Sequence, residues 1–141
     1  MNLMLRRMCP WALGALCILA VGCSFSRYKP LPQTGATLEG TVTYGKDKVP
    51  VAMIIATGDG GSAQSFVDDA GRYKLDNVPL GEVRLAVNVG AGRGQLMSKK
   101  MSGQHVPKVV DVPGKYADPA TTDIKTTINK GSNTFDIVIP R

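Results

Sequence analysis

Apolar side chains recur at every second position along most of the chain beyond residue 37. In residues 38–44, small and apolar residues alternate with glutamate and threonine, and residues 83–89 place four aliphatic side chains on one face. A period of two is typical of a β-strand with one buried face. No window after residue 23 has apolar side chains at helical spacing. Residues 95–101 come nearest to such a pattern, but they are too few for a stable helix. The chain is therefore predicted to be all-β.

Residues 37–141 are predicted to form one domain, a single antiparallel seven-stranded Greek-key β-sandwich. Turn-forming sequences separate the strands, and the last two strands are expected to pair as a hairpin around a turn at residues 130–133. In the turn at residues 68–71, an aspartate can cap backbone amides and a glycine tolerates positive φ. The expected strands cover residues 38–44, 51–56, 64–67, 72–75, 83–89, 124–128 and 135–139.

Residues 90–122 interrupt this pattern with what is predicted to be one long loop. Connections of that length are usually functional or poorly ordered. The loop is basic, which fits contact with an envelope protein or an anionic polysaccharide, and also fits a solvated loop without a partner. Nucleic acid is not expected, because no aromatic residues are interleaved for base stacking. The charged residues between 90 and 116 are Arg93, Lys99, Lys100, Lys108 and Lys115, against Asp111 alone.

The N-terminus reads as an export signal. Arg6 and Arg7 precede an apolar run at residues 8–22, too short for a typical spanning helix and ending in small residues, as in a signal peptide. The sequence Leu-Ala-Val-Gly-Cys at residues 19–23 resembles the lipobox of bacterial lipoproteins, with Ala where Leu is commonest. The resemblance implies a lipoprotein signal peptide at residues 1–22 and acyl chains, such as palmitate, on Cys23. A signal cleaved without lipid and an uncleaved anchor remain the alternatives.

Removal of residues 1–22 leaves 119 residues with a net charge of +4 and Cys23 as their only cysteine. The domain is therefore expected to have neither an internal disulfide nor a cysteine-based metal site. Residues 23–36 contain two prolines and no periodicity, and we expect them to form a tether between the lipid and the domain. The predicted location is the cell envelope of a bacterium, anchored to the membrane, and Ser24 after the cysteine favours the outer membrane.

Two stretches resemble carboxypeptidase-regulatory-like domains, which are small sandwiches of transthyretin-like topology. Residues 39–44 look like the opening strand of that family, and residues 68–83 contain its Asp-x-x-Gly-x-Tyr turn followed by Pro-x-Gly. The C-terminal part, from residue 113 to 119 and from 131 to 136, is similar to a subgroup of small bacterial lipoproteins. The resemblance implies a structural or binding module rather than an enzyme. The residues that fill the family's positions are Asp68, Gly71, Tyr73, Pro79 and Gly81.

No catalytic constellation is recognised in the sequence. His105 is the only histidine, and neither a His-Glu-x-x-His nor a Gly-x-Ser-x-Gly motif occurs. The glycines at residues 90–94 lack the third glycine and the βαβ unit of a dinucleotide site. Asp68 and Asp69 have calcium-type ligand chemistry, but turn capping accounts for them and no EF-hand spacing is present. We therefore expect no catalytic residues, no cofactor and no metal.

The sequence predicts a non-enzymatic, lipid-anchored module of the cell envelope with a structural or adaptor role. Its alternative is a carbohydrate-binding module at the cell surface, for which Tyr116 is the best aromatic platform. The oligomeric state is left open. The candidate partner contacts are Arg93, Lys99, Lys100, Lys108 and Tyr116.

Overall fold

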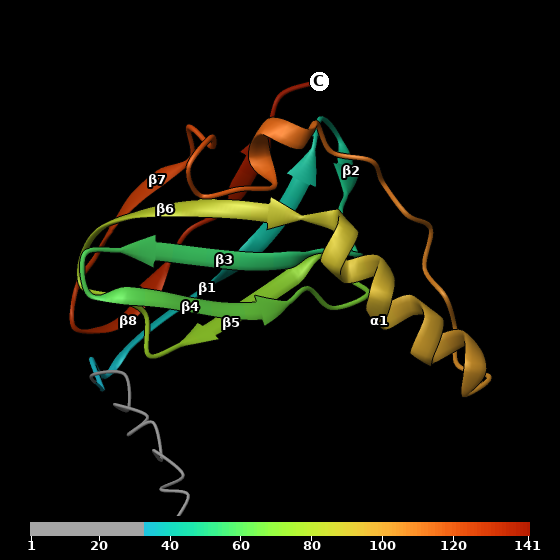
Figure 1. Cartoon of the computed structure of the whole chain (residues 1–141), viewed down its shortest axis with the longest axis horizontal. Coiled ribbons are helices and arrows are strands. Elements are labelled where there is room, and N and C mark those ends of the chain that lie inside the picture. Colours follow the sequence, from blue (N-terminus) through green and yellow to red (C-terminus); the bar gives the residue numbers. More distant parts are fainter. Residues whose placement is uncertain (1–32) are drawn as a thin grey trace, which may run out of the picture.

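Two β-sheets packed face to face make up the part of the chain that the computed structural model describes, residues 33–141. This confirms the predicted all-β sandwich (Figure 1). The expected signal peptide, Cys23 and most of the expected tether lie outside the described residues. The elements are β1 (Ala36–Tyr44), β2 (Asp47–Lys48), β3 (Met53–Gly58), β4 (Gly61–Phe66), β5 (Arg72–Asp76), β6 (Gly81–Asn88), α1 (Val89–Met101), the 3-10 turn η1 (Gly114–Tyr116), β7 (Lys125–Ile128), β8 (Gly131–Thr134) and β9 (Ile137–Ile139).

The first sheet is organised around β1. Strand β5 pairs antiparallel with the first part of β1, and β2 pairs antiparallel with its last two residues. Strands β8 and β9 pair with it in parallel, again in succession, so the all-antiparallel prediction is wrong for this sheet. The nine residues of β1 therefore hold four other strands in register.

The second sheet has the order β4-β3-β6-β7 and is antiparallel throughout. The predicted C-terminal hairpin is wrong, because β7 pairs with β6 in this sheet whereas β8 and β9 join β1 in the other. The chain crosses from one sheet to the other at residues 129–130. Asn133 holds the crossing, since its side-chain amide donates to the Asn129 and Thr37 carbonyls and its oxygen accepts from the Asn129 amide.

The core lies between the sheets and follows the alternation seen in the sequence. Side chains at every second position of β1, β5 and β9 meet those of β3 and β6. Complete burial of each large aliphatic side chain contributes about 1.5–3 kcal/mol relative to exposure. No buried side-chain nitrogen or oxygen in residues 33–141 lacks a hydrogen-bond partner. The largest fully buried side chains include Leu38, Ile54, Leu75, Leu85, Ile137 and Ile139.

A kink at residues 135–136 separates β8 from β9 and is bonded to β1. The Asp136 carboxylate accepts from both the amide and the hydroxyl of Thr41, each at 2.8 Å. These two bonds lower the pKa of Asp136. The Phe135 carbonyl oxygen accepts from the Tyr73 hydroxyl at 2.6 Å. A Cβ added to Gly40 would lie only 2.0 Å from that same oxygen. Only glycine at position 40 admits this approach.

Burial raises the pKa of the Tyr73 hydroxyl, and the nearby Asp136 carboxylate raises it further. The folded state therefore keeps Tyr73 protonated at a pH where the unfolded chain loses that proton. Stability from this group is fully present below about pH 10, the ordinary tyrosine pKa, and is lost as the pH rises beyond it.

We predict that Tyr73→Phe lowers the free energy of unfolding by about 1 kcal/mol near pH 7, because the Phe135 carbonyl loses its donor. Above about pH 10 the deficit should shrink, because only the wild type is destabilised by Tyr73 ionisation in the unfolded state. Urea unfolding followed by circular dichroism across this range measures both effects. Parallel pH curves for the two proteins would contradict the assignment.

Candidate functional site

Helix α1 occupies the first part of the segment expected to be a loop, so that prediction is wrong for residues 90–101. The Asn88 side chain caps the helix by accepting from the Ala91 amide at 2.9 Å. Gly92 packs against the backbone of Val51 and Ala52, just before β3. A Cβ added to Gly92 would lie 2.7 Å from the Ala52 nitrogen. No helix within residues 33–141 has the length and apolar character needed to cross a bilayer.

Beyond Gly92, α1 projects away from the sandwich (Figure 1). Two ion pairs fix this projecting part. Lys99 donates to Asp69, in the β4–β5 connection, at 2.8 Å, and Arg93 donates to Asp111 in the segment that returns from the helix. These two of the predicted contact residues therefore position the helix, although exposed pairs of this kind are each worth only about 0.2–1 kcal/mol.

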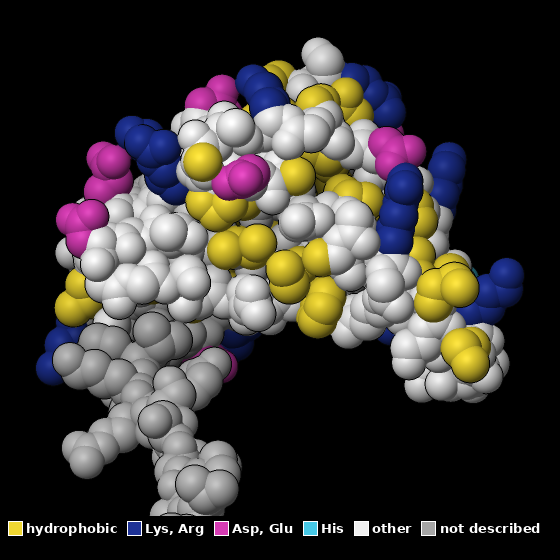
Figure 2. All heavy atoms as spheres, in the orientation of Figure 1, with side chains coloured by type: hydrophobic (Ala, Val, Ile, Leu, Met, Phe, Trp, Pro, Cys, Tyr) yellow, Lys and Arg dark blue, Asp and Glu magenta, His cyan; other side chains and the backbone are white. Residues whose placement is uncertain are grey.

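The free end of α1 exposes apolar side chains. Met97 and Met101 lie four residues apart, hence on one face of the helix, and are 66% and 87% exposed. Val106, on the returning segment, is 40% exposed. Figure 2 shows apolar side chains near the tip with basic side chains around them. The tip thus combines positive charge with methionine, a side chain that adapts to irregular partners.

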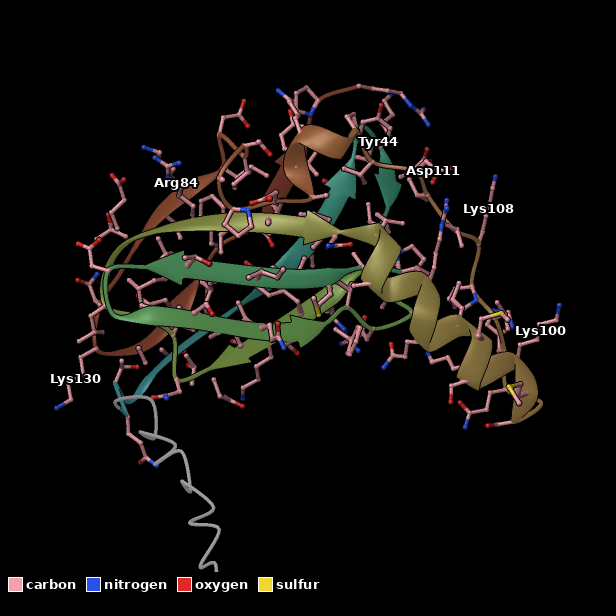
Figure 3. All side chains as sticks on the ribbon, viewed as in Figure 1. Tyr44, Arg84, Lys100, Lys108, Asp111 and Lys130 are labelled. Atoms are coloured by element: carbon pink, nitrogen blue, oxygen red, sulfur yellow. The ribbon has the colours of Figure 1, made fainter. Side chains whose placement is uncertain are left out.

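We call the region made of α1, residues 102–112 and the β1–β2 turn the basic end. Lys100 and Lys108 are exposed there, and no ion pair engages either of them within residues 33–141. Figure 3 shows both on the α1 side of the molecule and Lys130 on the opposite side. Lys46, in the turn between β1 and β2, and Lys48, in β2, join the same region through a hollow shared with Lys108. Sequence reasoning had no signal for these two, because 60 residues separate Lys48 from Lys108.

Tyr116 is wrong as a contact residue, because its side chain is only 3% exposed. It lies in η1, which packs against β6, and it belongs to the hydrophobic core. The Lys115 ammonium lies over its ring, 4.5 Å from the centroid, and is itself 3.3 Å from Asp123. A ring buried on the sandwich and covered by a cation offers no face for a sugar to stack on.

Asp68 acts as a turn cap. Its carboxylate accepts from the amides of Ala70 and Arg72 and from the Arg72 guanidinium, at 2.8–2.9 Å. Burial by itself raises the pKa of Asp68, but these bonds outweigh burial and lower it. No cluster of three metal-type ligands occurs among residues 33–141. The adjoining groove of about 550 Å³ over β1 and β5 carries both signs of charge, since Glu39 and Asp136 face Lys74 and Arg72.

No protein-family model and no curated protein sequence matches the chain. Among solved structures it is similar to a DUF3823 family protein from Bacteroides ovatus, with 19% identity and a TM-score of 0.45 over 74% of this chain, which spans 44% of that protein. It is similar to 5-hydroxyisourate hydrolase of Klebsiella pneumoniae, with 15% identity and a TM-score of 0.42 over 74% of this chain and 90% of the hydrolase. A dioxygenase domain from a Streptomyces dioxygenase carbohydrate-binding protein fusion is 14% identical, with a TM-score of 0.39 over 79% of this chain and 83% of that domain.

Two glycines of α1 test how the helix is positioned. We predict that Gly92→Ala lowers the free energy of unfolding by about 1–3 kcal/mol, because its Cβ would meet backbone atoms of Val51 and Ala52. A Cβ on Gly94 would have nothing within 4 Å, so Gly94→Ala should raise stability by up to about 1 kcal/mol through helix propensity. Denaturant unfolding of both variants provides the comparison. Shifts of the same sign and size would show that α1 does not pack as described.

Proposed function

We propose that the protein is a non-enzymatic module tethered to the bacterial cell envelope by lipid on Cys23, and that it binds an acidic envelope partner through the basic end. The observation that carries this proposal is a projecting, polar helix whose Lys100 stays free of ion pairs within the described residues. Free ammonium groups on such a projection attract and orient an acidic surface.

The division of charges within the basic end supports a contact role. Arg93 and Lys99 have carboxylate partners and position the helix, whereas Lys100 and Lys108 remain available. Exposed Met97 and Met101 add apolar area beside them. Because Tyr116 is buried, the carbohydrate-binding alternative has lost the residue on which it depended, and we do not propose it.

Lipid attachment is tested on the N-terminal peptide. We predict a diacyl or triacyl mass on Cys23 in protein isolated from membranes of the native bacterium, because the sequence up to this residue resembles a lipobox. In Cys23→Ser both the acyl mass and membrane retention should be lost. Two or more acyl chains give stable anchoring, so a partial loss of retention is not expected. An unmodified N-terminus in a soluble wild-type protein would contradict the anchor.

Partner binding is tested with charge-matched pairs of substitutions. We predict that Lys100→Gln combined with Lys108→Gln reduces recovery of envelope material, after crosslinking in intact cells, by at least about tenfold, or about 1.4 kcal/mol. The control is Lys74→Gln combined with Lys130→Gln, which removes the same charge from lysines outside the basic end. Equal recovery with both double variants would exclude the basic end as the contact.

A further inference from the structure

The basic end contains a hollow of about 430 Å³, and of its lysines only Lys108 belongs to the contact proposed above. One wall is Lys46 of the β1–β2 turn with Asp47 and Lys48 of β2, and the other is the returning segment with His105 and Lys108. Asp69, from the β4–β5 connection, completes the lining that carries charge. Two segments far apart in the sequence thus bring three lysines and the chain's single histidine to one place, and a third adds Asp69.

The acidic residues of the hollow are already engaged by cations. Asp47 accepts from Arg141 at 2.9 Å, and Asp69 accepts from Lys99 at 2.8 Å. Within residues 33–141, no hydrogen bond or ion pair occupies the ammonium group of Lys46, Lys48 or Lys108. With Arg141 and Lys99 included, five cationic side chains surround the hollow against two carboxylates, so it keeps a surplus of positive charge.

We propose that this hollow is a binding site for a phosphate group. A phosphate carries up to two negative charges and several acceptor oxygens, which match a hollow lined by three lysines from two sides. Lysine binds phosphate as a mobile point charge and needs no fixed planar geometry. The volume accommodates the phosphate together with part of the molecule that bears it. His105 adds a ring nitrogen to the same lining.

The position of the hollow indicates which kind of molecule bears the phosphate. Strand β1 starts at Ala36, next to the expected tether, and ends at Tyr44, next to the hollow. Its nine residues span about 30 Å. The site thus lies at the end of the sandwich remote from the anchor, so we assign it to a phosphate-bearing component other than the lipid of the anchoring bilayer. Only this choice of source rests on the proposed function, because it assumes the anchor at Cys23.

Lysine footprinting of the full chain in neutral detergent tests the site directly. The protein is acetylated briefly with and without inorganic phosphate, in buffers of equal ionic strength set with chloride, and each lysine is quantified by mass spectrometry. At about twice the dissociation constant of phosphate, a third of the sites remain free, so labelling of Lys46, Lys48 and Lys108 should fall about threefold. Lys130, exposed and outside the hollow, is the internal control and should not change.

A vesicle arm separates the two sources of phosphate. The full chain is reconstituted into vesicles of phosphatidylcholine alone or with phosphatidylglycerol, and the same lysines are footprinted. Protection by inorganic phosphate with no difference between the vesicles is the expected result. Protection by phosphatidylglycerol vesicles as well as by phosphate would overturn the non-lipid source and assign the site to headgroups. Protection by vesicles alone, or no protection, would overturn the site.

Substitution provides a second measurement that does not depend on labelling. Lys46→Ser combined with Lys48→Ser should weaken phosphate binding in calorimetry by at least about tenfold, about 1.4 kcal/mol. Lys74→Ser combined with Lys130→Ser should leave it unchanged, and an equal loss in both would mean general electrostatics and overturn the site. Loss of phosphate binding with intact partner recovery, or the reverse, distinguishes failure of this site from failure of the proposed function.

Discussion

The bonds between the Asp136 carboxylate and Thr41 hold together the sheet on which the rest of the molecule depends. Strand β1 reaches β8 and β9 in succession, and the kink between those strands would otherwise leave the Thr41 amide without its ladder partner. The carboxylate replaces the missing carbonyl, and Gly40 lets the kink approach closely. Because β1 also aligns β5 and β2, this one join fixes the register of five strands and the place of the basic turn at the end of β1.

The charges of the basic end divide into those that position α1 and those that form no ion pair within residues 33–141. Helix α1 buries little beyond Val89 and Gly92, so apolar packing alone cannot hold its outer turns. Ion pairs of Lys99 with Asp69 and of Arg93 with Asp111 hold these outer turns in place. Arg141 forms an ion pair with Asp47 and also lies over the Tyr44 ring. Among the described residues, Lys46, Lys48, Lys100 and Lys108 are exposed and form no ion pair.

The sequence predicted the sandwich because alternation reports directly which face of a strand is buried. Buried residues of β1, β5 and β6 that follow this pattern are Leu38, Val42, Tyr73, Leu75, Val83, Leu85 and Val87. It did not predict α1, whose three internal glycines and short apolar content give neither helix propensity nor a stripe. The Asn88 cap and the close packing of Gly92 support that helix, and both depend on tertiary neighbours.

The crossing between the sheets at residues 129–130 could not be predicted from the sequence either. A turn between two strands looks the same in sequence whether the strands pair with each other or with different sheets, and only the partners of β7 and β8 decide it. The hollow was missed for a related reason, since Lys46 and Lys48 meet Lys108 only because α1 sends the chain out and back. Tyr116 was misjudged because a lone aromatic in a polar segment gives no sign of what covers it.

The parallel pairing of the first and last strands has a mechanical consequence. If the chain is pulled at the start of β1 while a partner holds the far end of the sandwich, the force runs along β1 and the strands bonded to it. The ladders of β5, β8 and β9 then bear load together, in shear, instead of opening one bond at a time as in unzipping. Such an arrangement resists extension well, which suits the tethered role that we propose for this domain.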